Sequence, residues 1–374
     1  MRVVVATGPY ADTPGPLAAA VGLARGWSRH APGDQVIVAP VSDGGSGFVE
    51  VLAHALDAQP TPVVVTGPTG EEVPTQLLLH EGTAYIEAGQ AAGRHLADAA
   101  LAALSGLGAA PSDDEVERAL AALGSLTSRG VGELITAALE AGAARVVLGC
   151  GDLASHDGGV GMLSALGAGD DLRDLPEVRE RLREVSLVLA HATPLPLTGF
   201  HGASAALGTE HGVPAPLTQR LEERLGLLTE TVNRVLPPRS DLLTGKPLRP
   251  ERAAGAGVGG GVGYAALLLG ATPADGASFV IDEIGLGDVL PGALVVTGAA
   301  RYDWRTVHDG VIPEVARAAL EVGAPSIVLA QHVEVGRREG MALGISGSYA
   351  PRPGEDLADL AERVARTWSP QHGG

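Results

Sequence analysis

The sequence predicts an α/β fold, with a Rossmann- or flavodoxin-like parallel sheet domain joined to a second, mixed α/β domain. Short β-branched runs alternate with longer segments rich in Ala and Leu, which is typical of parallel strands covered by helices. Two apolar runs separated only by Glu81 and Gly82 predict a hairpin instead, so the middle of the chain should be built differently. A length of 374 residues fits about two domains at ~150 residues each.

The first elements follow from the spacing of apolar residues. Leu17, Val21 and Ala24 recur at helical intervals and predict a helix over residues 17–27. The pattern predicts further elements in this order: strand 3–6 before that helix, then strand 35–41, helix 48–56, strand 61–66 and the hairpin of 77–80 with 83–87.

The later elements continue the alternation. The predicted helices are 130–141, 158–167, 217–235, 264–269 and 312–322, and the predicted strands are 145–149, 185–190, 278–281, 293–297 and 326–330. Residues 97–115 are expected to form a surface connection, and residues 237–250 form a polar, proline-rich segment that carries the single lysine, Lys246. The last ~20 residues are expected to form a frayed helix. We expect one discontinuous domain of residues 1–75 and 275–374, a second domain of residues 76–274, and a cleft between them.

The composition excludes several classes of partner and compartment. The formal net charge is −18 and aromatic residues make up only 3%, so a nucleic-acid partner or an anionic membrane surface is disfavoured. A single cysteine, Cys150, rules out an intrachain disulfide; its place between glycines predicts a small buried side chain rather than a nucleophile. The apolar run near Met1 is too short for a signal peptide and no ~18-residue apolar stretch occurs, so we expect a cytoplasmic protein.

Glycine clusters follow several predicted strands, where ligands bind in parallel sheets. Residues 42–47 (Ser-Asp-Gly-Gly-Ser-Gly) join a strand to a helix, so they could receive an anion at the helix N-terminus. Asp43 could hold a metal there, or the segment could be a tight turn with Asp43 as the helix cap. Residues 149–159 hold four glycines with Asp152 and Asp157, which favours an anion or Mg²⁺-phosphate site over a simple turn capped by Asp157.

Two further clusters carry weaker signals. Residues 255–263 are glycine-dense and precede an apolar run, so they could cradle phosphates; they lack the Gly-Lys-Ser/Thr ending of a Walker loop, and a flexible linker is the alternative. In residues 297–303, Arg301 could neutralise phosphate charge and Asp303 could bind Mg²⁺, or the two could form a surface ion pair.

Taken together, these segments resemble the bacterial glycerate kinase family over nearly the whole chain. The matching segments are residues 41–47, 128–135 (Ser-Arg-Gly-Val-Gly-Glu-Leu-Ile), 154–159 (Ala-Ser-His-Asp-Gly-Gly), 202–204, 255–263 and 297–298. The resemblance implies two α/β domains around a cleft, ATP as co-substrate, Mg²⁺ as cofactor, and phosphoryl transfer to a hydroxyl of glycerate. We therefore expect a small hydroxy acid and a nucleotide as partners, and a homodimer.

The departures from the family pattern fall at polar positions. Three family lysines are replaced by Ala11, His211 and Gly310, and residues 151–153 read Gly-Asp-Leu where the family has Gly-Gly-Ser. Two functions therefore stay open: an ATP-dependent kinase, a transferase acting on the alcohol group of glycerate or a related hydroxy acid, and a catalytically degenerate homologue (a pseudoenzyme) that binds a ligand or a protein.

The residues expected to carry the site come from these loops. They are, for catalysis, Asp157, Asp43 and Arg301; for substrate or phosphate binding, Gly44, Gly45, Gly151, His156, Gly158, Gly159, Gly257, Gly259, Gly260, Gly298 and His308; and for Mg²⁺, Asp303.

Overall fold

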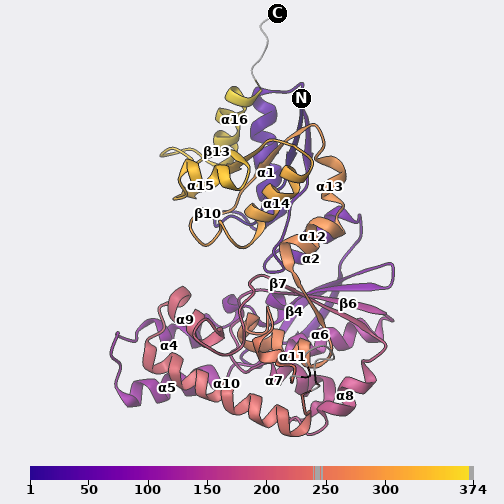
Figure 1. Cartoon of the computed structure of the whole chain (residues 1–374), viewed down its shortest axis with the longest axis vertical. Coiled ribbons are helices and arrows are strands. Elements are labelled where there is room, and N and C mark those ends of the chain that lie inside the picture. Colours follow the sequence, from indigo (N-terminus) through magenta and orange to yellow (C-terminus); the bar gives the residue numbers. More distant parts are fainter. Residues whose placement is uncertain (239, 241–244, 246, 370–374) are drawn as a thin grey trace, which may run out of the picture. The chain divides into compact units, whose positions relative to one another are not determined.

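The computed structural model describes residues 1–238, 240, 245 and 247–369, and Lys246 lies outside them (Figure 1). The chain divides into two compact units, unit 1 with Met1–Ala58 and Gly276–Gly374, and unit 2 with Gln59–Asp275. Residues 59–75, expected in the first domain, lie in unit 2 because strand β3 (Thr61–Thr66) pairs along its whole length with β4 (Glu72–His80).

Unit 1 is built on a five-stranded parallel sheet in the order β13-β11-β9-β1-β2, which confirms the predicted parallel sheet. Its strands are β1 (Arg2–Val5), β2 (Gln35–Val38), β9 (Ala293–Thr297), β11 (Ser326–Leu329) and β13 (Ile345–Tyr349). Strand β1 pairs with β2 on one side and with β9 on the other. The strand order of the sheet therefore reverses at β1, which is the position where parallel sheets commonly bind ligands.

Helices and one short ladder complete unit 1. The helices are α1 (Pro16–His30), α2 (Phe48–Ala55), α12 (Gly276–Glu283), α13 (Leu286–Val289), α14 (Val311–Glu321), α15 (Arg337–Ala342) and α16 (Leu357–Trp368), and the ladder joins β10 (Arg301–Tyr302) to β12 (His332–Val333). The predicted strand over 278–281 was wrong, because these residues lie in α12. Ala277, Val280 and Ile281 are buried at helical spacing there, and a four-residue apolar run does not distinguish helix from strand.

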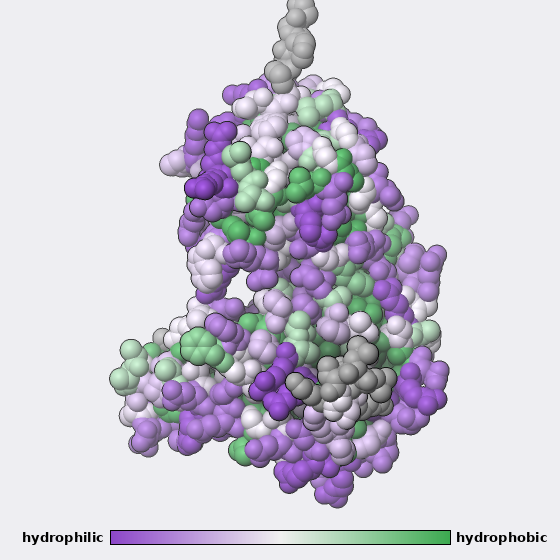
Figure 2. Space-filling model, viewed as in Figure 1, coloured by the Kyte–Doolittle hydropathy of each residue, from purple (hydrophilic) through white to green (hydrophobic). Residues whose placement is uncertain are grey.

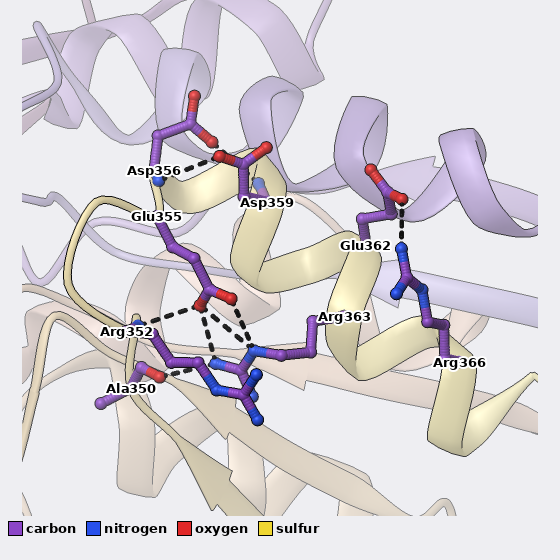
Figure 3. Close-up of polar contacts among 8 residues, drawn as sticks. All are labelled: Ala350, Arg352, Glu355, Asp356, Asp359, Glu362, Arg363 and Arg366. Carbon is purple, nitrogen blue, oxygen red and sulfur yellow. Dashed lines mark hydrogen bonds and ion pairs between the residues drawn. The ribbon is translucent and has the colours of Figure 1, made fainter.

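The expected C-terminal helix is present as α16, which lies against α1 (Figure 1). The expectation that it is frayed was wrong for residues 357–368, because one face of the helix is buried. Leu360 and Val364 are almost fully buried in one apolar cluster with Leu23 and Trp27 of α1. A capping box at Asp356 supports the first turn of α16. The guanidinium of Arg363 donates to both carboxylate oxygens of Glu355 and to the Ala350 carbonyl, which fixes the preceding loop (Figure 3).

Unit 2 contains a mixed six-stranded sheet in the order β3-β4-β5-β6-β7-β8. Its remaining strands are β5 (Thr83–Glu87), β6 (Arg145–Cys150), β7 (Ser186–His191) and β8 (Thr272–Asp275). Strands β4 and β5 pair antiparallel, which confirms the predicted hairpin, and β5 to β8 pair in parallel. The carboxyl ends of β6 and β7 therefore lie at the same edge of the sheet.

Helices surround this second sheet. They are α3 (Ala88–Ala92), η1 (Arg94–Leu96), α4 (Asp98–Ser105), α5 (Asp113–Gly124), α6 (Arg129–Glu140), α7 (Val160–Leu163), η2 (Ser164–Ala168), α8 (Leu175–Arg181), α9 (Ala203–His211), α10 (Ala215–Val235), η3 (Pro250–Arg252), η4 (Val258–Gly261) and α11 (Val262–Leu268). The surface connection expected over 97–115 was wrong, because it contains α4 and the start of α5, and Leu101 and Leu104 pack with Leu120 and Leu217.

No helix in the described part of the chain is long and apolar enough to cross a membrane. On the face shown in Figure 2, hydrophilic and neutral residues cover most of the surface, and hydrophobic residues show in separate patches.

Candidate functional site

Asp157 links two segments of unit 2 through one carboxylate. Its Oδ2 accepts hydrogen bonds from the Ser128 N–H (3.0 Å), the Ser128 hydroxyl (2.8 Å) and the Gly161 N–H (3.1 Å), and its Oδ1 accepts from the Gly159 N–H (2.9 Å). The Ser128 hydroxyl in turn accepts from the Met162 N–H at 3.0 Å. Four donors share the carboxylate. Asp157 therefore holds the loop of residues 155–161 against the start of α6.

The glycine-rich loop of residues 255–261 packs directly on the loop that follows β6. The Gly158 N–H donates to the Gly260 carbonyl at 3.0 Å. A Cβ at Gly260 would lie 2.1 Å from the Ser155 carbonyl oxygen, and Gly260 has a φ of 62°. Only glycine meets both requirements without strain. These glycines thus serve close packing of two loops, whatever ligand they also meet.

A pocket opens where these two loops meet helix α9 and the segment after β7. Five residues expected from the sequence line it, namely Gly151, His156, Gly257, Gly259 and Gly260. Gly158 and Gly159 lie next to it in the chain and hold the loop through the contacts above. These five residues, from segments about 100 residues apart in the chain, therefore lie around one concavity of unit 2.

The uncharged polar side chains of the pocket wall include the partly exposed His156 and the buried Ser155. His156 Nε2 lies 3.1 Å from the Ser204 hydroxyl, and burial lowers the pKa of His156 to about 4, so its imidazole is neutral at pH 7. Ser155 is 2% exposed, and its hydroxyl makes no hydrogen bond within the described residues. A buried hydroxyl without a partner is unfavourable. The Ser155 oxygen is itself enclosed, so a ligand would reach it only after the side chain rotates toward the pocket.

Three charged or titratable side chains lie at the pocket around Asp152. The Asp152 Oδ2 accepts from His211 Nε2 at 2.9 Å and lies 3.6 Å from Arg94 Nε. Arg94 begins η1, and a β-bridge between Gly93 and Leu153 fixes this segment to the loop after β6. Neither Arg94 nor Ser155 was expected from the sequence.

In unit 1, the candidate residues lie at the carboxyl edge of the parallel sheet. The Asp43 Oδ1 accepts from the Gly45 N–H at 2.9 Å, and Gly44 has a φ of 94° in the turn that leads to α2. Gly298 follows β9, where a Cβ would lie 1.8 Å from the Leu329 carbonyl oxygen. Parallel sheets bind ligands at this edge. The roles expected for Asp43, Gly44, Gly45 and Gly298 are consistent with this position and stay predictions.

Arg301 and Asp303 form an ion pair with each other. Arg301 Nε donates to Asp303 Oδ2 at 3.1 Å, and its Nη2 donates to Glu334 at 2.6 Å. Burial alone would raise the pKa of Asp303, but hydrogen bonds from Thr306, Arg301 and Arg305 outweigh it and lower that pKa. The neighbouring His308 is exposed.

The predicted Mg²⁺ ligand does not have a free carboxylate. Asp303 Oδ1 accepts from the N–H groups of Arg305 and Thr306, and Oδ2 is held by Arg301. In the described ranges, no group of three or more His, Cys, Asp or Glu side chains could hold a metal ion. The residues around Asp303 therefore do not fit a Mg²⁺ site.

Cys150 is a buried thiol at the end of β6. Its side chain is 0% exposed, and burial raises its pKa. The prediction of a small buried side chain is confirmed, and a thiolate nucleophile is disfavoured.

Comparisons with known proteins point in one direction. The model of the Glycerate kinase family matches residues 3–368. An uncharacterized protein of Mycobacterium bovis is 36% identical over 372 residues, covering 97% of this chain and 89% of that protein. A glycerate kinase of Bacillus subtilis is 31% identical over 396 residues, covering 98% and 96%. The solved structure of a protein provisionally named glycerate kinase 2, from Salmonella typhimurium LT2, superposes with a TM-score of 0.69 at 27% identity, covering 98% of both chains.

Proposed function

Because the chain belongs to the glycerate kinase family, we propose that it transfers the γ-phosphoryl group of ATP to a hydroxyl of glycerate or of a related small hydroxy acid. ATP is the co-substrate that kinase membership implies. The observation that carries the proposal is the pocket of unit 2, where the loop after β6 and the glycine-rich loop meet.

The proposed reaction needs positioning more than covalent chemistry. The acceptor hydroxyl oxygen forms a bond to the γ-phosphorus while the bond between that phosphorus and the bridging oxygen breaks, so ADP leaves and the hydroxyl loses its proton. In the pocket, the Ser155 hydroxyl and the neutral His156 imidazole would orient the acceptor. Asp157 would position the loop that carries both residues.

The turn at residues 43–45 is the proposed contribution of unit 1 to phosphate binding. The Gly44 and Gly45 N–H groups lie just before α2, where they donate to the Ser42 hydroxyl and to the Asp43 carboxylate, so a phosphate bound there would replace these partners. Asp43 lies in the same turn. Mg²⁺ is commonly held by substrate phosphates together with one or two carboxylates of the protein.

A specific observation favours the second candidate, a degenerate homologue that binds without turnover. Arg301 and Asp303 neutralise each other, and Ala11, His211 and Gly310 stand where the family resemblance places lysines. Fewer uncompensated cations are then available to stabilise a transferring phosphoryl group.

An assay of the purified full chain separates the two candidates. With ATP, Mg²⁺ and glycerate, the kinase should form ADP and phosphoglycerate in equal amounts, measured by a coupled ADP assay and ³¹P NMR. Asp43→Asn should lower the rate by about 10²–10³-fold if Asp43 acts at the phosphates. The control Asp282→Asn changes an exposed carboxylate of α12 and should leave the rate unchanged.

Product from none of the hydroxy acids tested would contradict the kinase. A thermal shift on adding ATP or a hydroxy acid, together with that absence of product, would favour the binding module.

A further inference from the structure

The pocket of unit 2 has a mainly aliphatic wall. Apolar side chains line it from five segments of the chain, and these are Leu123, Leu153, Leu195, Ala206, Leu207 and Val258. Glycerate carries an oxygen on every carbon, so an aliphatic wall would leave at least one of its hydroxyl groups without a hydrogen-bond partner. An unpaired buried hydroxyl is unfavourable, whereas a methyl group in the same place gains from burial.

One cation of the pocket keeps donors for a ligand. Arg94 approaches Asp152 only through Nε, at 3.6 Å, and its side chain makes no hydrogen bond within the described part of the chain. The two terminal nitrogens of its guanidinium are therefore available, and this fork matches a carboxylate. The Asp152 carboxylate also lies 2.9 Å from His211 Nε2, and Glu210 lines the same pocket, so Arg94 is the arginine through which this wall can attract an anion.

The position of Arg94 is fixed rather than incidental. The Gly93–Leu153 bridge and the hydrogen bond from the Ala154 N–H to the Ala92 carbonyl (2.8 Å) attach its segment to the loop that carries Ser155. Arg94, Leu153 and Ser155 thus belong to one locally fixed group.

We propose that the acceptor of this pocket is a hydroxy acid with an aliphatic substituent, that Arg94 binds its carboxylate, and that Leu153 and Leu207 contact the substituent. Ser155 then meets the hydroxyl group. This inference rests on the proposed function for turnover, but it also makes a separate claim about binding. The molecule expected to bind is a four- or five-carbon monohydroxy acid rather than the more polar glycerate.

The first test compares acceptors of the full chain with ATP and Mg²⁺. We expect kcat/KM for 2-hydroxybutanoate or 3-hydroxybutanoate to exceed that for glycerate by about 10-fold or more, which is the range that one buried methylene supplies. The same ranking is expected for the affinities of the acids alone, measured by isothermal titration calorimetry. Equal or higher kcat/KM and affinity for glycerate would overturn the inference.

The second test uses variants with matched controls. Arg94→Leu should weaken binding of the preferred acid by about 10–100-fold and leave binding of its neutral amide nearly unchanged. Arg183→Leu, which removes an exposed arginine of unit 2, should change neither. Leu207→Asn should shift the preference toward glycerate, and Leu227→Asn, at a side chain 63% exposed, should not. Equal loss of the acid and the amide in Arg94→Leu would contradict the role of Arg94.

The two measurements separate this inference from the kinase itself. Tight, Arg94-dependent binding of an aliphatic hydroxy acid without any ADP would contradict the proposed function and support the inference. Turnover of glycerate in preference to the aliphatic acids would support the proposed function and contradict the inference. Binding of neither class of acid would overturn the inference.

Discussion

The candidate polar residues of the two units differ in how fully their hydrogen-bonding groups are used. In unit 1, Arg301 and Asp303 are satisfied by each other and by neighbouring groups of the same loop. In unit 2, Asp157 is equally satisfied, but the same loop carries the enclosed, unpartnered hydroxyl of Ser155 and places the neutral imidazole of His156 at a pocket. Polar residues in a glycine-rich loop can thus stabilise the loop or remain available to a ligand, and only their hydrogen bonds tell which.

The close packing of the two loops in unit 2 gives the largest expected effect. Gly260→Ala should lower the free energy of unfolding by about 2–4 kcal/mol, because the new Cβ meets the Ser155 carbonyl oxygen and the backbone has a positive φ. Urea denaturation of the full chain measures it.

Gly142→Ala provides the control for this change. Gly142 also has a positive φ, 84°, but no atom lies within 4 Å of its Cβ position, so only about 1 kcal/mol is expected. Equal losses in the two variants would show that contact between the loops does not matter.

His156 should make stability depend on pH in mildly acidic solution. Its pKa is about 4 in the folded protein and 6.5 for an ordinary histidine, so the unfolded chain takes up a proton first as the pH falls. The stability that the neutral imidazole contributes is present above pH 6.5 and is lost between pH 6.5 and 4. For this partly exposed side chain we expect a loss of about 1–2 kcal/mol between pH 7 and 5.

Chemical denaturation of the wild type and of His156→Gln at several pH values checks this expectation. The variant should lose less stability over that range, whereas His332→Gln, at an exposed histidine of unit 1, should behave as the wild type. An unchanged pH dependence in His156→Gln would show that the imidazole is not held neutral by the fold.

Asp303 should make stability depend on pH in more acidic solution than His156 does, and its effect on the free energy of unfolding should be the smallest of the three. Its pKa is below the ordinary 3.8, so the stability contributed by the carboxylate is present above that pH and lost as the pH falls through the folded value. Asp303→Asn should therefore flatten the decline in stability below about pH 4, and Asp282→Asn should not. A decline with the same slope in Asp303→Asn would contradict the ion pair with Arg301.

Much of the fold could be predicted because its strands are short, apolar and regularly separated. Strand β9 and the β4–β5 hairpin follow the pattern closely. The strand predicted over residues 278–281 was wrong because a run of four mostly apolar residues fits either a strand or a helix. In residues 97–115, a capping box of Ser112 and Glu115 was a usable helix signal, but alanine-rich sequence obscured it.

The candidate site was predicted only in part, because its residues come from distant segments. Glycine clusters indicate the loops after β6 and before α11 by themselves. Arg94 reaches the site through the Gly93–Leu153 bridge, and Ser128 reaches it through Asp157, 29 residues away. Ser128 begins the matched segment 128–135, but its contact with Asp157 leaves no local pattern in the sequence, and Arg94 lies in no matched segment.

The bridge between Gly93 and Leu153 has a consequence for redesign. The bridge ties the segment of Arg94 to the loop after β6, so these two sides of the pocket should move together. Lengthening either segment would therefore misplace the guanidinium. New acceptors should therefore be sought by exchanging the leucines that face the ligand, with both loop lengths kept.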